Sequence, residues 1–543
     1  MPVHRATSWG WSSARGQVLA DAGLGVLRYV VPPEVADEAV GDGLAWEMRL
    51  RSLPARVGVY FVLGLCLFTD KPYGKVIGQV TAGLGKKLAA VGWRVPSSGG
   101  LTGVRRRLGE KPLESVFRRL CSPLSPGTAP WSHICGLLAV AWDGTTIGVA
   151  DTAANAEVFG RPGAGGNKKT RKNKKNEKDE KDEKGAQEGA AEGEGAVPGP
   201  QARLVTLIAC GTRGMIDAAM GPCRGKGTGE RALAAELLSS LRKGMLLLAD
   251  RNFYSWDLWN AAAGTGAHLL WRVQEGVLLP VAAELEDGSY LARIQDPAQV
   301  RRRTARNGAR RRRGSKQPPG NEPVRSVTVR VIQYVLTVTE EEEGPGGKRR
   351  TVTRAEPYRL ITTLTDWRRY PAAELAAAYA WRWAIETGYR ECKTYLRGSG
   401  RLLRAQTPAL ARQELWALLA VYQAVRTLIV GAAASAGLDP DRISFTNALD
   451  AVRGTMASPR GQLAATVAGT QAQILTGLVP ERAGRVCARA RKRRPYPYPS
   501  PAHARTPISR HATYTATITP PRTTHRNTPH QHPHPETTPS QPP

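Results

Sequence analysis

Short apolar runs that alternate with helical segments constrain the fold of this 543-residue chain more than any other feature. The runs GLLAVAWDGTTIGVAD, ARLVTLIACGT, GMIDAAMGP, MLLLAD and HLLWRV have the β-branched and apolar content of strands. Between them lie ERALAAELLSSLRKG and FYSWDLWNAAAGTG, which have helical patterns and end at glycines. Such alternation is typical of an α/β sheet whose strands are buried on both faces. We therefore expect an α/β domain over residues 131–435.

The flanking segments are predicted to be helical. PPEVADEAV opens with a proline pair and SLPARVGVYFVLGLCLF with a Leu-Pro entry, and both are helix-start signals. We expect a helical N-terminal domain over residues 1–125 and a helical region over 436–484. The N-terminal domain could offer five arginines to DNA, although for any single one of them a solvated helix face is the better interpretation: Arg105, Arg106, Arg107, Arg118 and Arg119.

Three segments depart from this pattern. Residues 162–200 form a low-complexity charged run that cannot bury a core, and we expect a disordered insertion in a loop. Residues 275–355 contain strand-like GSYLARI, SVTVRVIQYVLTVTE and KRRTVTRAE, which predict a β-rich insertion. Residues 485–543 are first basic and then rich in proline, threonine and histidine, which predicts a disordered tail.

The charge balance indicates a polyanionic partner. Lysine and arginine total 77 against 46 acidic residues, for a formal net charge of +31. Neutralising phosphates releases counterions and favours binding to nucleic acid. A basic tail on an otherwise ordinary protein is the alternative, but the basic residues are spread over most of the chain. We therefore expect DNA as the partner.

Cysteine, histidine and hydropathy patterns exclude several classes of protein. The seven cysteines include no CxxC pair, so zinc and disulfide frameworks are not indicated. Only three of the nine histidines precede the C-terminal tail, which leaves carboxylates as the catalytic candidates. The longest apolar run, Val57–Phe68, has 12 residues, whereas a membrane span needs about 20. We expect a soluble intracellular protein with no signal peptide and no membrane partner.

The segment YAWRWAIETGYRECK carries the most specific group of polar residues. An α-helix turns about 100° per residue, so one wedge of about 60° holds four of them: Tyr379, Arg382, Glu386 and Lys393. Glu391 falls roughly 120° from Tyr379. The helix therefore presents Glu386, and not Glu391, beside an arginine and a lysine.

A surface helix with charge pairs four residues apart would give a similar pattern, at roughly a few tenths of a kcal/mol per pair. Flanking Trp381, Trp383 and Ile385 suit burial, however. We therefore expect Glu386 to be a partly buried carboxylate in an active site that faces phosphate.

One carboxylate does not make a magnesium site, because Mg²⁺ takes several oxygen ligands. Two-metal phosphoryl transfer holds its ions about 3.5–4 Å apart, so acids must converge from different elements. Asp143 directly follows LLAVAW, and Asp250 ends MLLLAD. Ligand sites of open α/β sheets gather at strand ends. Either aspartate alone could instead form a turn or cap a helix, but with Glu386 they make the best triple.

Three other aspartates fit this role less well. Asp151 lies eight residues beyond Asp143, about 26 Å away if the strand continues. Asp257 falls inside a helical pattern. Asp217 lies in a strand among small residues, with no basic companion.

In these features the chain resembles the insertion-sequence-4 family of DDE transposases. WDGTT around Asp143 and LLLADRNF around Asp250 resemble the two aspartate motifs of that family. Its Y-(2)-R-(3)-E-(6)-K signature is present at full spacing in Tyr379, Arg382, Glu386 and Lys393. The N-terminal helical segments also look like the family's N-terminal domain, so the resemblance covers residues 20–435. The chain departs from the family in the 162–200 run, in Asn252 and in the tail.

The resemblance implies an RNase H-like catalytic core with a β-rich insertion before the final glutamate. The implied ligands for Mg²⁺, with Mn²⁺ as a substitute, are Asp143, Asp250 and Glu386. The residues implied to contact the DNA backbone near the cut are Tyr379, Arg382 and Lys393. The implied partners are double-stranded DNA, as terminal inverted repeats and as target, and a second copy of the chain in a dimeric synapse.

The expected function is that of a transposase in the bacterial cytoplasm, associated with the nucleoid. It would bind transposon ends, cleave DNA and catalyse strand transfer by two-metal phosphoryl transfer. Two alternatives stay open. One is an RNase H-like nuclease that cuts without strand transfer, and the other is a catalytically decayed, DNA-binding transposase remnant.

Overall fold

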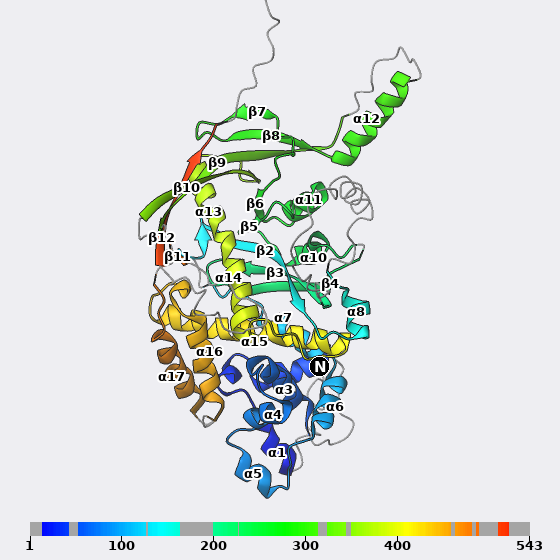
Figure 1. Ribbon diagram of the computed structural model, residues 1–543, viewed down its shortest axis with the longest axis vertical. Coiled ribbons are helices and arrows are strands. Elements are labelled where there is room, and N and C mark those ends of the chain that lie inside the picture. Colours follow the sequence, from blue (N-terminus) through cyan, green and yellow to red (C-terminus); the bar gives the residue numbers. More distant parts are fainter. Residues whose placement is uncertain are drawn as a thin grey trace, which may run out of the picture.

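The computed structural model describes residues 14–42, 53–125, 129–162, 199–225, 227–312, 323–343, 349–457, 462–480, 485–487 and 509–520. Helices form one end of the molecule, a mixed sheet fills the middle and the strands of the insertion form the other end (Figure 1). The predicted disordered insertion at 162–200 lies outside the described residues, apart from its first residue and its last two.

Five strands form one half of the sheet, from its edge strand inwards, in the order β4–β3–β2–β5–β6. β2, β3 and β4 are antiparallel neighbours, whereas β5 runs parallel to β2 and β6 runs parallel to β5. This order and these directions are those of an RNase H-like core, so the predicted fold is confirmed. The bounds are β2 Leu137–Gly148, β3 Gln201–Ala209, β4 Met215–Pro222, β5 Met245–Ala249 and β6 His268–Arg272, and β1, His133–Ile134, pairs with the start of β2.

Helices cover both faces of this sheet, as the continuous apolar strands require. On one face α10 (Glu230–Glu236) and α11 (Trp256–Gly264) pack on alternate side chains of the strands, including Trp142. On the other face α13 (Ala372–Tyr379) packs on the intervening side chains. The helix predicted to end at Gly244 is shorter than expected, because α10 ends at Glu236 and a 3₁₀ turn follows.

The β-rich insertion continues the core sheet. β10 pairs with β6, β9 pairs with β10, and β8 pairs with the first part of β9. The arginine-rich stretch between β8 and β9, expected only to separate strands, forms helix α12. The bounds are β7 Val281–Glu284, β8 Tyr290–Gln295, α12 Pro297–Arg312, β9 Ser326–Glu343 and β10 Arg349–Thr362.

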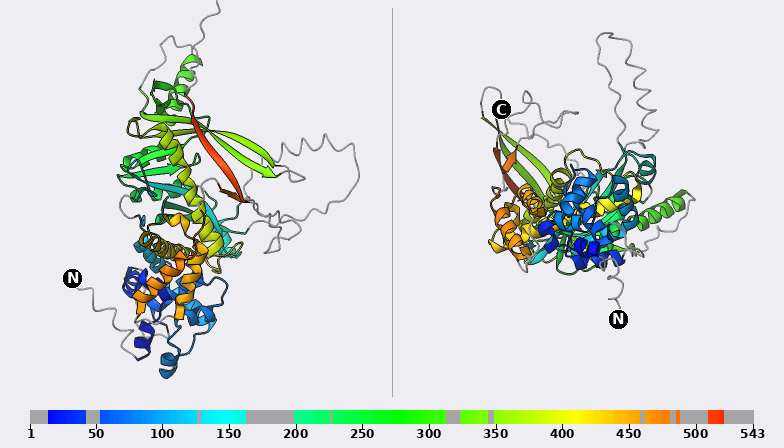
Figure 2. Two further views of the ribbon diagram at one scale, coloured as in Figure 1. Left: turned by 90° about the vertical axis from the view of Figure 1, so that its left-hand side faces the viewer. Right: turned by 90° about the horizontal axis from the view of Figure 1, so that it is seen from below.

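The tail is not wholly without structure. β12 (Ser509–Ile518) pairs antiparallel with β9, beyond the part of β9 that β8 covers, and β11 (Arg485–Cys487) pairs with β12 (Figure 2). The prediction of a disordered tail is therefore wrong for β12. Its threonine, tyrosine and isoleucine content favours a strand, and the free edge of β9 supplies the backbone partners. The proline-rich residues after 520 lie outside the described part of the chain.

Helices from the two ends of the sequence share one apolar core. α15, at its centre, contacts α3, α7, α16 and α17. Its length and hydropathy would allow a membrane span, but 83% of its most apolar window is buried inside the protein. The bounds are α1 Ala14–Ala20, α2 Pro33–Asp42, α3 Ala55–Leu67, α4 Tyr73–Val80, α5 Gly85–Ala90, α6 Ser98–Leu108, α7 Lys111–Leu120, α8 Ala153–Phe159, α15 Pro408–Ser435, α16 Phe445–Gly454 and α17 Leu463–Leu475.

One of the five N-terminal arginines is not available to DNA. Arg105 is 1% exposed and lies between α6 and α15. Its guanidinium donates to Gln413 Oε1 at 3.0 Å and to Glu414 Oε2 at 3.3 Å. Arg106, next in the chain, is exposed. Sequence periodicity could not separate the two, because the partners of Arg105 come from a helix far along the chain.

Arg105→Ala should lower the free energy of unfolding by about 3–5 kcal/mol, because it leaves the buried carboxylate of Glu414 without its ion pair. Urea denaturation measures this change. Arg106→Ala is the matched control and should change stability by less than about 0.5 kcal/mol. Equal effects of the two substitutions would contradict the assigned contact.

Candidate active site

The register of β2 and β5 brings two of the predicted acids side by side. Ala141 is the partner of Leu248 in this parallel pair. Two residues further along each strand stand Asp143 and Asp250. Because side chains alternate between faces, both acids point to the face that α13 covers, on strands about 4.8 Å apart. Each carboxylate also accepts the next backbone N–H, at 2.8 Å for Asp143 and 2.6 Å for Asp250.

The helix that carries the other predicted residues is not one regular α-helix. After α13 come a 3₁₀ turn over Ala380–Arg382, α14 over Trp383–Arg390 and a π-helical turn over Glu391–Leu396. The assumption of a uniform rotation per residue is therefore wrong in detail, because 3₁₀ and π turns have different pitches. The wider π turn changes the angular positions of the residues after Arg390. The tighter 3₁₀ turn does the same for the residues after Tyr379.

Arg382 links two of the three predicted acids, Asp143 and Glu386. Its guanidinium is buried, with Nη2 3.2 Å from Glu386 Oε1 and Nη1 3.9 Å from Asp143 Oδ2. Burial lowers the pKa of Arg382, but Tyr379, Asp143, Glu386 and Asp250 outweigh it and raise that pKa overall. The structure thus pairs Asp143 and Glu386 with one positive charge, and Asp250 lies near enough to help raise the pKa of Arg382.

The remaining signature residues contact the two strands. Lys393 Nζ donates to Thr145 Oγ1 at 2.9 Å, two residues beyond Asp143. Tyr379 is buried, and its hydroxyl donates to the carbonyl of Ala249 at 3.1 Å, directly before Asp250. In this structure the Tyr379 hydroxyl therefore holds the end of β5, and its contact with DNA stays a prediction.

Tyr389 is a site residue that the sequence analysis missed. Its buried hydroxyl donates to the carbonyl of Asp143 at 2.6 Å and accepts from Thr206 Oγ1 at 3.0 Å. Tyr379 and Tyr389 thus attach the helix to β5 and to β2, the strands that carry the two aspartates. On an ideal helix Tyr389 falls roughly 20° beyond the wedge of the four signature residues, so the same periodicity could have found it.

The expected burial around Glu386 is only partly correct. Ile385 is buried, but Trp383 is 55% exposed and the Glu386 side chain is 42% exposed. Arg382 lies over the ring of Trp383, 5.1 Å from its centroid. α14 therefore packs on the protein through its Ile385 side and leaves the Glu386 carboxylate open to a substrate.

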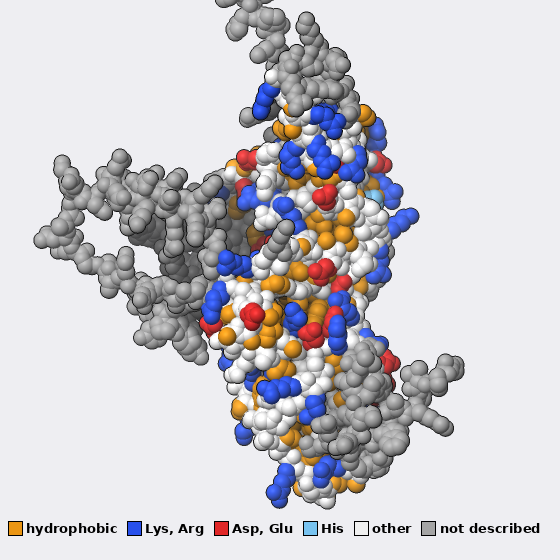
Figure 3. Space-filling model, turned by 90° about the vertical axis from the view of Figure 1, so that its right-hand side faces the viewer, with side chains coloured by type: hydrophobic (Ala, Val, Ile, Leu, Met, Phe, Trp, Pro, Cys, Tyr) orange, Lys and Arg blue, Asp and Glu red, His pale blue; other side chains and the backbone are white. Residues whose placement is uncertain are grey.

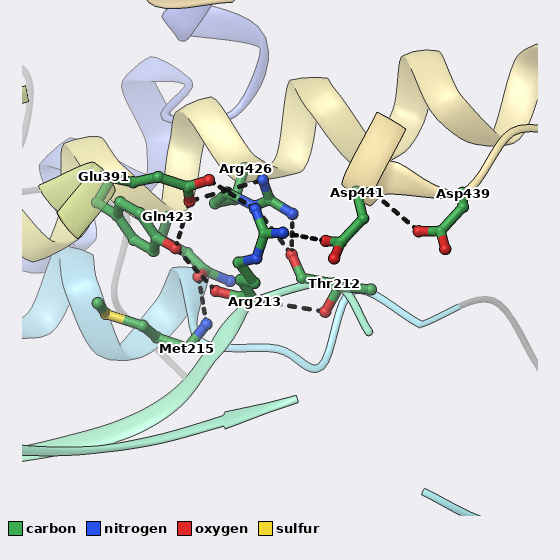
Figure 4. Close-up of polar contacts among 10 residues, drawn as sticks. Thr212, Arg213, Met215, Glu391, Gln423, Arg426, Asp439 and Asp441 are labelled. Atoms are coloured by element: carbon green, nitrogen blue, oxygen red, sulfur yellow. Dashed lines mark hydrogen bonds and ion pairs between the residues drawn. The ribbon is translucent and has the colours of Figure 1, made fainter. Parts of the chain in front are cut away.

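Glu391, the rejected neighbour, has a structural role. It is buried, 2.6 Å from Arg213 Nη1 and 3.7 Å from Arg426 Nη1, and it accepts from the Tyr422 hydroxyl at 3.2 Å (Figure 4). Arg213 also pairs with Asp441. This network fastens the π-helical turn to α15 and to the β3–β4 turn, directly after the helix that carries Glu386.

A fourth carboxylate lies next to Asp143. A Cβ atom on Gly144 would stand 2.3 Å from the carboxyl group of Glu230, the first residue of α10. The absence of a side chain at this position leaves room for the Glu230 carboxyl group to lie against β2. Burial raises the pKa of Asp143 to about 6, with Glu230 and Glu386 adding to the effect and the Gly144 N–H and Arg382 opposing it.

The three rejected aspartates lie outside this group. Asp217 does have basic company, contrary to expectation, because Arg118 of α7 donates to it at 2.6 Å. That partner is far away in sequence, which is why the sequence analysis missed it. Asp151 pairs with Arg161, and Asp257 lies in the first turn of α11.

The donor set fits a hard divalent cation. Asp143, Asp250 and Glu386 offer only carboxylate oxygens, which Mg²⁺ prefers. In the described part of the chain no three acidic, histidine or cysteine side chains already stand close enough together to hold one ion. Arg382 pairs with two of these acids, Asp143 and Glu386.

The strand order, the paired aspartates and the glutamate on the following helix together define a DDE-type RNase H-like protein. Residues 21–118 match the insertion element 4 transposase N-terminal family, and residues 136–424 match the transposase DDE domain family. The chain therefore belongs to the insertion-sequence-4 family of DDE transposases.

One relative agrees with this assignment. The chain is 26% identical over 418 residues to the transposase InsG for insertion sequence element IS4 of Escherichia coli K12, across 76% of this chain and 78% of that protein. A cryo-EM structure of the piggyBac transposase synaptic complex with hairpin DNA matches 82% of this chain and 84% of its own, at 11% identity and a TM-score of 0.36. The RNase H-like assignment rests on the strand order of this chain and not on that likeness.

Gly144→Ala should lower stability by no more than about 1 kcal/mol, because the added methyl group meets the end of the flexible Glu230 side chain, which can move aside. In a Glu230→Ala background the same substitution should cost much less, which a double-mutant cycle by urea denaturation measures. Gly78→Ala in α4, where an added Cβ meets nothing within 4 Å, is the control and should not destabilise. An equal cost of Gly144→Ala in both backgrounds would rule out Glu230 as its steric partner.

Asp143→Asn should change how stability depends on pH. The pKa of Asp143 is about 6 in the folded protein and about 3.9 in an unfolded chain. Ionisation of Asp143 therefore leaves the free energy of unfolding unchanged below about pH 4 and lowers it by the full amount above about pH 6. The variant should be more stable than the parent at about pH 8, by up to about 3 kcal/mol, and lose this advantage as pH falls to about 4. Urea denaturation without divalent cations measures the difference, and a pH-independent difference would refute the raised pKa.

Proposed function

We propose that this chain is an active transposase that binds transposon ends, cleaves the DNA there and joins the freed ends to a new site. The observation that supports the proposal is the pairing of Asp143 and Glu386 with Arg382, together with the register that sets Asp143 level with Asp250. Family membership supports it, and the Escherichia coli relative is itself a transposase.

Asp143, Asp250 and Glu386 would hold Mg²⁺, or Mn²⁺ in its place. The bound metal would supply activation of the attacking oxygen and stabilisation of the leaving oxygen in phosphodiester chemistry. Three carboxylates around one guanidinium leave a negative balance, which favours divalent cations at this place. The open side of Glu386 gives a DNA strand access to the site.

The cationic side chains would position DNA. Arg382 can bind a phosphate through two parallel N–H groups, and Lys393 acts as a point charge. Both are held by partners on the strand of Asp143, Arg382 through Asp143 itself and Lys393 through Thr145. Because the helix is attached to β2 and β5, these groups would approach a phosphate in a fixed geometry. Such fixed positioning of charged groups is a main source of rate enhancement in phosphoryl transfer.

Glu386→Ala should abolish cleavage of labelled element ends in Mg²⁺, because one metal ligand is removed, and should leave end binding unchanged. Asp143→Ala should behave in the same way. Binding of Mn²⁺, followed by electron paramagnetic resonance, should weaken in both variants and so reports the metal site independently of activity. Asp257→Ala, an exposed acid in α11, is the control and should cleave normally. Mg²⁺-dependent cleavage that persists in Glu386→Ala would contradict the assignment of Glu386 as a metal ligand.

The same purified protein and labelled DNA distinguish an active transposase from a nuclease and from a decayed transposase. Labelled ends incubated with a target plasmid should give joined products if the chain is a transposase. Cleavage without joined products would instead indicate a nuclease on the same fold. End binding without cleavage by the parent chain would indicate a decayed transposase.

A further inference from the structure

Helix α12 is a basic element that the active site does not use. It spans Pro297–Arg312, 16 residues between β8 and β9. It contains no acidic residue and seven arginines: Arg301, Arg302, Arg303, Arg306, Arg310, Arg311 and Arg312. Its composition is therefore far more basic than a solvated helix face requires.

No packing against the body accounts for this helix. None of its described side chains is buried, and Arg301, Arg302 and Arg312 are exposed. α12 projects from the end of the molecule that the insertion forms (Figure 1). Lysine and arginine side chains gather on that end in the space-filling view (Figure 3). A helix that is polar all round gains no hydrophobic stabilisation from its neighbours.

The beginning of the helix, by contrast, is held in place. Asp296 is buried and accepts the backbone N–H of Ala298 at 2.9 Å and the guanidinium of Arg325 at 2.7 Å. The backbone N–H of Arg325 donates to Gln299 Oε1 at 2.8 Å. α12 is thus fixed at its root to the start of β9, and its remaining length, about 20 Å, points away from the body.

The arginines repel one another along the projecting part of the helix. Arg302 and Arg306 are four residues apart, and Arg303 and Arg306 are three apart, spacings at which like charges destabilise a helix. A polyanion relieves this repulsion, because its phosphate groups bring negative charges between the guanidinium groups. Arginine also binds phosphate with two N–H groups at once. The helix is therefore suited to a polyanionic surface.

The distribution of charge around α12 indicates how it would bind. At about 100° per residue, Arg301, Arg302 and Arg303 alone cover roughly 200° of the helix circumference. A helix that reads base edges presents one face to the major groove. Charges spread round the axis instead suit contacts with phosphates on several sides, which carry no sequence information.

We propose that α12 is an arm that binds the phosphate backbone of duplex DNA without regard to sequence. The proposal rests on the proposed function only in taking DNA as the polyanion. The duplex it binds can be the DNA that flanks the element or the target, and these two sources share the same backbone chemistry. The arm lies at the opposite end of the molecule from the N-terminal helices, so it lengthens the DNA-binding surface (Figure 1).

The test compares the full-length protein with the variant R301A/R302A/R303A. Binding to fluorescent duplexes is measured by anisotropy without Mg²⁺, over a range of salt concentrations, for an element end and for an unrelated duplex of equal length. The variant should bind both duplexes about 10- to 100-fold more weakly at moderate salt. The plot of the logarithm of the association constant against the logarithm of the salt concentration has a negative slope. This slope should become shallower by about 2.7, or about 0.9 for each phosphate that the variant no longer neutralises.

Two controls make the result specific. R301K/R302K/R303K keeps the charge and should restore the salt slope, while any remaining decrease in affinity reports the two-pronged arginine contact. The thermal unfolding midpoint of the alanine variant should equal that of the parent, because no buried side chain is removed.

An unchanged salt slope for both duplexes would overturn the proposal. Weaker binding confined to the element end would also overturn it, because the arm would then read sequence. Since the binding assay needs no cleavage, a catalytically inactive parent chain would refute the proposed function and leave this test standing.

Discussion

The guanidinium of Arg382 is the contact on which the site depends. The carboxylates of Asp143 and Glu386 repel each other across the sheet and the helix, and burial of Asp143 raises its pKa further. A buried arginine between them offsets part of that repulsion. It pairs with Asp143 and Glu386 at once and leaves the Glu386 side open to a substrate. A divalent cation or a DNA phosphate entering the site would alter the same balance of charge.

The rest of the core serves to keep this helix in place. The hydroxyl groups of Tyr379 and Tyr389 attach it to the ends of the two aspartate strands. Beyond them, the buried pair of Glu391 and Arg213 fastens the next turn to the helical body. Removing one partner of such a pair leaves an uncompensated buried charge, so the helical body contributes to the geometry of a site that it does not touch.

The insertion extends the sheet and adds positive charge far from the catalytic centre. β10 continues the core through β6, and β9 offers an edge that β8 and the tail strand β12 share. Pairing with the tail covers an edge that would otherwise expose unpaired backbone groups. The basic α12 projects from this rigid frame, so catalysis and the proposed backbone binding occupy separate elements.

Local sequence determined a large part of this protein. Strand and helix runs follow from the periodicity of neighbouring residues, and the four-residue signature predicted a helix face that carries Arg382 and Glu386 towards the sheet. Tertiary structure decided what depends on partners distant in the chain. The register that sets Asp143 level with Asp250, the burial of Arg105, the salt bridge of Asp217 and the pairing of β12 are of this kind. Periodicity describes one element at a time, whereas these contacts form only when separate elements pack.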